Sequence, residues 1–199
     1  MAQGMSHFVA SGDLGAYGCG DGKTLSVDFP SALPNITAVG GTTAFQAVDG
    51  KYFKEMAWNG PIEGAGTGGG ASRYYPLPSY QKGVAQSAGQ GMRQVPDVAG
   101  VADPASGFSF IFDGQSGQGG GTSAAAPLWA GTVALISQDL TQKGLREAGF
   151  ANPALYWRAK NSSKSPPPTM HGDAGGTKLA NEAQPERGSR HRHGRTKQG

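Results

Sequence analysis

A glycine loop followed by a serine and small residues is the segment of this sequence best suited to chemistry. Residues 119–127 read Gly-Gly-Gly-Thr-Ser-Ala-Ala-Ala-Pro, and an apolar run follows at 128–136. Glycines permit a sharp turn and the close approach of a substrate backbone. Ser123 would stand at a helix N-terminus, where free N–H groups and the helix dipole favour an oxyanion. The segment suggests a nucleophilic serine, and the competing interpretation is an ordinary helix cap.

The remaining sequence indicates the elements that must position this loop. Short apolar strands are expected at residues 7–10, 36–43, 96–102 and 108–114, and helices at 123–139 and around 152–156. The 36–43 strand is expected to break at its glycines, residues 44–58 to form a hairpin about Asp49-Gly50, and residues 59–72 to form a glycine-rich loop. A short helix or turn is expected to begin at Pro78. This alternation indicates an α/β protein with a largely parallel sheet.

Composition sets the domain organisation and the classes of partner. The chain has 199 residues, enough for one domain with a core, and its 34 glycines indicate many tight turns. The pattern ends near residue 160, so residues 1–160 are expected to fold, and residues 161–199 to form a disordered basic tail. The tail carries seven Lys or Arg and three Asp or Glu, whereas the body is nearly neutral. We therefore infer no nucleic-acid partner.

Cysteine content and hydropathy limit the kinds of cross-link, metal site and membrane association that the chain could have. Cys19 is the only cysteine, so neither an internal disulfide nor a thiolate metal site is possible within one chain. No run approaches 18 apolar residues, and we expect no membrane partner. His191 and His193 lie close together in the tail, where a solvated basic segment is favoured over a metal site. Residues 1–7 have neither the charged region nor the apolar region of a signal peptide.

Seven blocks in order identify a resemblance to a known family. The blocks are 8–13, 27–31, 37–42, 68–72, 95–99, 102–104 and 120–123. With these blocks the chain resembles the sedolisins, or serine-carboxyl peptidases, over about residues 1–157, and this implies a subtilisin-like fold that is incomplete on its N-terminal side.

A classical subtilisin is the nearest competitor, but it requires a histidine as base. The four histidines here are His7, before an expected strand, and His171, His191 and His193 in the tail. None stands in a His-Gly-Thr context, and this favours the carboxyl variant.

The resemblance implies a role for two residues in a peptidase reaction. Ser123 would attack the peptide carbonyl, and a glutamate held by an aspartate would take its proton. Asp13 corresponds to the aspartate of the family's oxyanion hole, although a turn or helix-cap role is the alternative. Because a carboxylate repels an oxyanion, Asp13 must be protonated to donate a hydrogen bond, and this predicts an acidic optimum.

Other matching positions suggest contacts with a substrate. Asp28 corresponds to an aspartate that in some relatives reaches the pocket for the residue before the cut, where it would favour Arg or Lys; ordering of a loop is the alternative. Gly69 and Gly70 would lie along the substrate backbone, or form a plain flexible loop. Asp97 and Asp103 fall in matching blocks and are interpreted as structural.

Two features of the family are missing from this sequence. In the family, the catalytic glutamate and aspartate lie on a helix upstream of the Ser-Gly-Asp block. In this sequence only twelve residues precede Asp13, and the first glutamate is Glu55. The family also binds calcium, and Asp173 is a weak match that alone cannot supply the about six to eight oxygens that calcium needs. No cofactor is therefore assigned with certainty.

These observations lead to one principal hypothesis. The chain is expected to be a fragment of a secreted serine-carboxyl endopeptidase that acts on peptide or protein substrates at acidic pH and is inactive alone. We expect a monomer, marginally stable because apolar surface and strand edges are exposed. The alternatives are a degenerate non-catalytic peptide-binding protein and, without support from a Gly-x-Ser-x-Gly elbow, an esterase.

Overall fold

The computed structural model describes residues 4–46, 52–60, 65–84 and 91–161, and within them the chain forms eight strands and three helices. The strands are β1 (Phe8–Ala10), β2 (Thr37–Gln46), β3 (Tyr52–Ala57), β4 (Gly70–Pro76), β5 (Met92–Val95), β6 (Val98–Val101), β7 (Phe108–Phe112) and β8 (Gln115–Gly119). The helices are the 3-10 helix η1 (Ser79–Gln81), α1 (Thr122–Gln142) and α2 (Asn152–Asn161).

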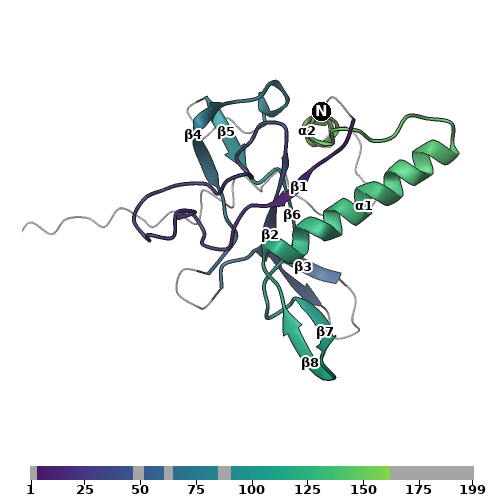
Figure 1. Cartoon of the computed structure of the whole chain (residues 1–199). Coiled ribbons are helices and arrows are strands. Elements are labelled where there is room, and N and C mark those ends of the chain that lie inside the picture. The colour runs from purple at the N-terminus through teal and green to yellow at the C-terminus, as the bar shows by residue number, and fades with distance from the viewer. Residues whose placement is uncertain (1–3, 47–51, 61–64, 85–90, 162–199) are drawn as a thin grey trace, which may run out of the picture.

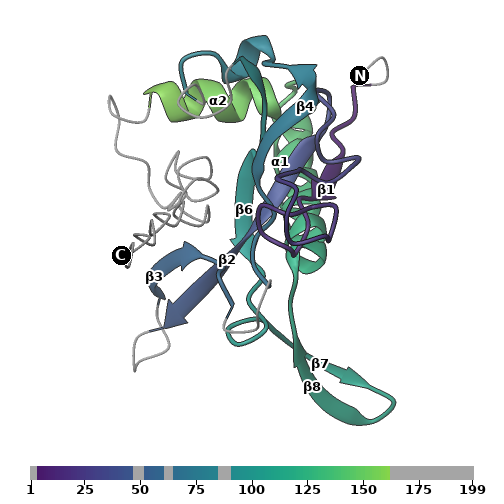
Figure 2. The ribbon, with the colours of Figure 1, turned by 90° about the vertical axis from the view of Figure 1, so that its left-hand side faces the viewer.

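A small mixed sheet forms the centre of the molecule. β2 pairs in parallel with β1 on one side and with β6 on the other, and its second half pairs antiparallel with β3. The long helix α1 packs against β1, β2 and β6 (Figure 1). Two separate antiparallel pairs, β4–β5 and β7–β8, complete the strands, and the β7–β8 hairpin projects from the body (Figure 2). The α/β class and the parallel centre agree with the prediction.

The expected break at the glycines of the second strand is wrong. β2 runs without interruption through Gly40 and Gly41. Glycine is needed at both positions because neighbouring residues occupy the space that a side chain would fill. A Cβ atom at Gly40 would lie 2.6 Å from the ring of Pro96, and one at Gly41 would lie 2.6 Å from Ala102 Cβ. The glycines therefore allow close packing of β2 rather than a turn.

Two of the observed strand pairings were not predicted from local patterns. β4 and β5 pair with one another, and the glycine-rich β8 pairs with β7 over five residues. Residues 42–46 and 52–57 form an antiparallel pair, in agreement with the hairpin expected at 44–58, whereas the expected turn at Asp49-Gly50 lies outside the described residues. The same is true of residues 162–199, on which the expected disordered tail falls.

The hydrophobic core is small and rich in alanine. It consists of Val39, Trp58, Ala102, Ala125 and Ala126. Short side chains on α1 let the helix lie close to the sheet, and Trp129 Nε1 donates to the Ala99 carbonyl at 2.8 Å.

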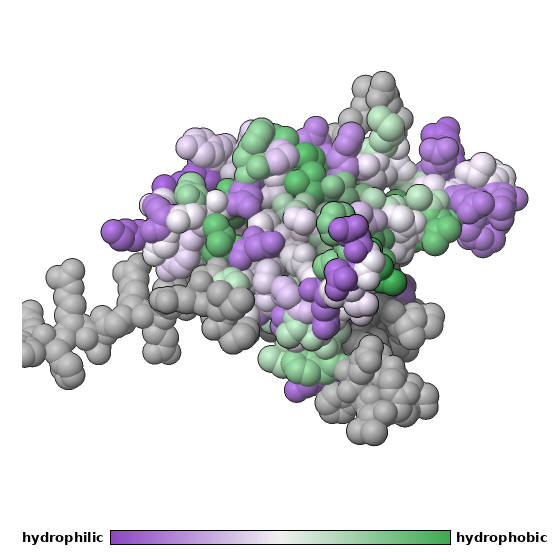
Figure 3. Space-filling view, turned by 60° about the horizontal axis from the view of Figure 1, so that its bottom comes forward, coloured by the Kyte–Doolittle hydropathy of each residue, from purple (hydrophilic) through white to green (hydrophobic). Residues whose placement is uncertain are grey.

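Large apolar side chains remain exposed on α1 and on the β7–β8 hairpin. Leu135 and Ile136 on α1 and Ile111 and Phe112 on β7 are among them. Apolar areas also lie between polar ones on the face in Figure 3. Apolar exposure was expected from the sequence, and marginal stability stays a prediction.

A buried ion pair connects the sheet to the C-terminal helix. The side chains of Arg93 and Asp97 are both fully buried, and Arg93 donates through both terminal nitrogens, at 2.8 Å to Oδ1 and 2.6 Å to Oδ2. The same carboxylate accepts from the Ala38 amide at 2.8 Å and from the Tyr156 hydroxyl at 2.9 Å. Burial raises the pKa of Tyr156. Asp97 thus joins β2, β5 and α2, in agreement with its expected structural role.

Removing one partner of this pair should destabilise the fold strongly. Replacing Asp97 with alanine strands a buried guanidinium, so the free energy of unfolding should fall by about 3–5 kcal/mol. The matched control is Asp139→Ala, because Asp139 forms an exposed i,i+4 pair with Lys143, whose loss should cost less than about 0.5 kcal/mol. Urea titrations of both variants compare the two losses, and equal effects would contradict the assigned role.

Candidate active site

Ser123 lies in the first turn of α1 with its side chain exposed. The helix cap is Gly121, with φ of +93°, so the interpretation of Ser123 as a simple cap is wrong. Neither the hydroxyl nor the main-chain N–H of Ser123 has a hydrogen-bond partner among the described residues. A free hydroxyl beside a free amide at a helix N-terminus suits a nucleophile whose product oxyanion binds nearby.

Asp13 accepts two hydrogen bonds from Thr122, the residue that precedes this serine. Its Oδ1 atom accepts from the Thr122 amide at 2.8 Å and from the Thr122 hydroxyl at 2.6 Å. The Thr122 hydroxyl in turn accepts from the Gly12 amide at 3.2 Å. Asp13 therefore caps α1 from a distant segment, so the cap role and a position beside Ser123 coincide.

Two glycines before the serine allow this arrangement. A Cβ atom on Gly121 would lie 2.8 Å from Asp13 Oδ2, and one on Gly120 would lie 2.1 Å from the Ala102 carbonyl oxygen. Gly121 also donates its amide to that carbonyl at 2.5 Å. The glycines predicted from the sequence to give a sharp turn thus also bring α1 against the loops that follow β1 and β6.

Asp28 lies near Asp13 in a cradle of glycines. A Cβ atom on Gly12 or on Gly18 would approach the Asp28 carboxylate to 2.0 or 2.3 Å. Burial, followed by the negative charge of Asp13, raises the pKa of Asp28. The Asp28 main-chain carbonyl accepts from Ser31 and from Ala32, whereas no described residue donates to its carboxylate.

Gly69 and Gly70 belong to an ordered segment that packs against the loop after β1. Gly69 is buried, and its amide donates to the Gly15 carbonyl at 3.3 Å. Gly70 begins β4, and a Cβ atom on it would lie 3.3 Å from Val27. A contact of these glycines with substrate stays a prediction.

Asp103 is buried and bonded within the protein. Its carboxylate accepts from the Thr43 hydroxyl at 2.7 Å and from the Ala105 amide at 2.9 Å. These bonds match its expected structural role.

The metal prediction falls outside what the structure describes. Asp173 lies beyond the described residues, and those residues include no group of three or more His, Cys, Asp or Glu side chains able to hold a metal ion. No helix among them is long and apolar enough to cross a membrane.

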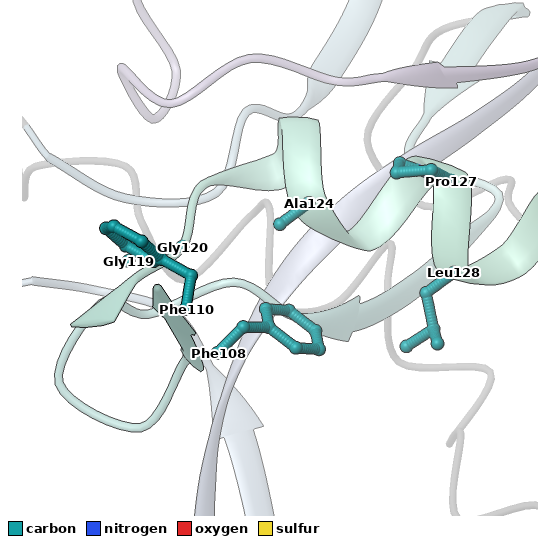
Figure 4. A pocket seen from close by; sticks show the side chains of 7 residues that line it. All are labelled: Phe108, Phe110, Gly119, Gly120, Ala124, Pro127 and Leu128. Atoms are coloured by element: carbon teal, nitrogen blue, oxygen red, sulfur yellow. The ribbon is translucent and has the colours of Figure 1, made fainter. Parts of the chain in front are cut away.

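An apolar pocket beside the serine was not predicted from the sequence. It encloses about 480 Å³ between the β7–β8 hairpin and the start of α1 (Figure 4). Its signal in the sequence is the alternation of Phe108 and Phe110, which had predicted only a strand. The lining residues are Phe108, Phe110, Gly119, Gly120, Ala124, Pro127 and Leu128.

Comparisons with known proteins agree with this arrangement. Residues 1–160 match the subtilase family. The chain is 40% identical over 188 residues to kumamolisin of Bacillus sp. (strain MN-32), covering 92% of this chain and 32% of kumamolisin. It is 39% identical over 159 residues to sedolisin of Pseudomonas sp. (strain 101), covering 75% of this chain and 27% of sedolisin.

A solved structure supports the same relationship. The chain resembles Pseudomonas sedolisin, a serine-carboxyl proteinase in complex with pseudo-iodotyrostatin, with a TM-score of 0.69 and 35% identity. The match covers 83% of this chain and 45% of that one. The chain thus spans about a third of the length of the curated relatives, and less than half of the sedolisin structure.

The raised pKa of Asp28 predicts a distinctive dependence of stability on pH. A folded-state pKa above the ordinary value of 3.8 gives stability that is complete below that pH and is lost as pH rises through the folded pKa. Asp28→Asn should therefore stabilise the protein at about pH 7 and do so progressively less toward about pH 3, as followed by urea titration.

A second aspartate provides a control of opposite sign. Hydrogen bonds from Thr24, then from the Lys23 amide, lower the pKa of Asp21 to about 2. Asp21→Asn should therefore remove stability that is present above about pH 4 and lost on further acidification. Parallel pH profiles for the two variants would contradict the environment assigned to Asp28.

Proposed function

This chain belongs to the subtilase family and, within it, to the sedolisin-type serine-carboxyl peptidases, and from this premise we propose that it carries the nucleophile and oxyanion site of an endopeptidase acting at acidic pH. The observation that carries the proposal is the attachment of Asp13 to Thr122 beside the exposed Ser123. The substrate is a peptide or an unfolded protein, and the proposed site of action is extracellular.

Ser123 attacks the carbonyl carbon of the peptide bond, and its hydroxyl proton passes to a base. The carbonyl oxygen becomes an oxyanion, which the free Ser123 amide at the helix N-terminus stabilises. Collapse of the tetrahedral intermediate breaks the C–N bond, and the leaving amine takes up the proton. The acyl group remains on Ser123 until water hydrolyses the ester.

Asp13 supplies the second donor to the oxyanion. Its Oδ1 atom is engaged by Thr122, so the proton that it donates must be on Oδ2, the oxygen on the side of Gly121. A protonated Asp13 donates a hydrogen bond, whereas an ionised one would repel the oxyanion. We therefore expect the reaction to require acidic solution.

The base must come from outside the described residues. No described carboxylate or imidazole hydrogen-bonds to Ser123, and general-base assistance contributes about a hundred- to ten-thousand-fold. The resemblance implies a glutamate held by an aspartate on an upstream helix. We infer that this chain needs such a helix for turnover.

Asp28 is proposed to recognise a basic side chain preceding the cleaved bond. It adjoins Asp13, and no described residue occupies its carboxylate. Its raised pKa means that its negative charge, and so its attraction for Arg or Lys, increases as pH rises.

A chimera tests the proposed function directly. The part of kumamolisin upstream of the matching region is fused to this chain, and cleavage of a denatured protein is measured at about pH 4. We expect activity in the chimera, none in its Ser123→Ala variant, and none in the 199-residue chain alone. Ser123-dependent cleavage by the chain alone would disprove the need for an outside base, and peptide binding without turnover by the chimera would favour a non-catalytic protein.

Substitutions of Asp13 test its role in the same chimera. Asp13→Ala should lower kcat about 100- to 1,000-fold, as for loss of an oxyanion donor. Asp13→Asn keeps an acceptor for Thr122 and supplies N–H donors without protonation, so the alkaline limb of the kcat/KM profile should move to higher pH. An unchanged profile in Asp13→Asn would show that protonation of Asp13 does not limit the reaction.

A further inference from the structure

We propose that the apolar pocket between the β7–β8 hairpin and α1 binds a bulky apolar side chain of the peptide substrate, on the leaving-group side of Ser123. The inference rests on the proposed function and deepens it, because it names a second determinant of which bond is cut. Its volume of about 480 Å³ is within the range of about 300–1,000 Å³ typical of ligand pockets.

The pocket adjoins the nucleophile. Gly119 and Gly120 line it from just before the Gly-Thr-Ser turn, and Ala124, immediately after Ser123, lines it from the first turn of α1. Pro127 and Leu128 extend the wall along the helix (Figure 4). A peptide held at Ser123 therefore reaches the pocket with a side chain close to the cleaved bond.

The location relative to the two aspartates determines the side. Asp13 and Asp28 approach Gly12, Gly18 and Gly121, and none of these five residues lines the pocket. The segment after β1 and the β7–β8 hairpin extend from the start of α1 in different directions (Figures 1 and 2). Because Asp28 is proposed to hold the side chain before the cut, on the side of Asp13, the pocket is left for the residue after the cut.

Glycines in β8 pre-form one wall of the pocket. The Phe110 ring lies over β8, where a Cβ atom on Gly117 or on Gly119 would approach it to 2.5 or 3.1 Å. Phe108, two residues earlier on the same face of β7, contributes the second ring (Figure 4). A wall that is already in place lowers the ordering cost of binding.

The chemistry of the lining specifies the occupant. All seven lining residues are apolar, and two of them are aromatic. A phenylalanine or leucine side chain would replace water there, whereas an acidic or basic one would lose hydration without compensation. The site therefore combines a carboxylate for the residue before the cut with an apolar pocket for the residue after it.

Binding of a fluorine-labelled peptide to the 199-residue chain tests the pocket without relying on turnover. The probe is a short peptide with 4-fluorophenylalanine after the scissile position, and the comparison peptide has aspartate there. The fluorine signal should shift on binding, and the aspartate peptide should bind at least about tenfold more weakly. Phe108→Ala with Leu128→Ala should weaken the fluorinated peptide by a similar factor.

Leu135→Ala is the matched control, because Leu135 is an exposed leucine on the same helix that does not line the pocket. It should leave affinity unchanged, and circular dichroism checks the fold of every variant. Equal affinity for the two peptides, or equal weakening by the control, would overturn the pocket assignment. Binding that is lost in the active chimera would show that upstream polypeptide covers the pocket, which overturns the assignment while leaving the proposed function intact.

Discussion

The contact of Asp13 with Thr122 is the interaction on which the site depends. It joins the loop that follows β1 to the N-terminus of α1, two segments separated by 109 residues in sequence. One oxygen accepts both the amide and the hydroxyl of Thr122, and this fixes the first turn of the helix. That turn sets the position of Ser123. Position 121 needs a glycine, because its φ of +93° disfavours other residues and a side chain there would meet Asp13.

A second polar centre, around Asp97, stabilises the fold away from the candidate site. Asp97 binds Arg93, the Ala38 amide and the Tyr156 hydroxyl, so one carboxylate fixes the start of β6, the middle strand and the last helix. The two centres divide their roles. The Asp97 carboxylate is buried and accepts four hydrogen bonds or more, whereas the half-buried Asp28 carboxylate receives no hydrogen bond from a described residue.

Local sequence patterns correctly predicted the helices and strands that are specified by residues close together in the sequence. The helix after Ser123, the strand before Asp13 and the strand at Phe108 were each expected close to their observed bounds. The uninterrupted β2 was not, since Pro96 and Ala102, distant in sequence, pack against its glycines. The glycine-rich β8 was also not predicted, because glycine has a low strand propensity and the strand forms by pairing with the neighbouring β7. A family resemblance predicted Ser123 and Asp13 as site residues, and their catalytic roles stay predictions. The link through Thr122, the glycine cradle of Asp28 and the pocket depend on tertiary packing, which no spacing of residues reveals.

The hydrogen bonds between Asp13 and Thr122 fix the backbone of the candidate site without holding the side chain of the candidate nucleophile, Ser123. Nothing in the described structure holds the Ser123 side chain, whereas the turn that presents it is fixed by the bonds of Thr122 to Asp13 and of Gly121 to the Ala102 carbonyl. The hydroxyl is therefore an interchangeable component: a thiol or a selenol at position 123 would be displayed from the same backbone.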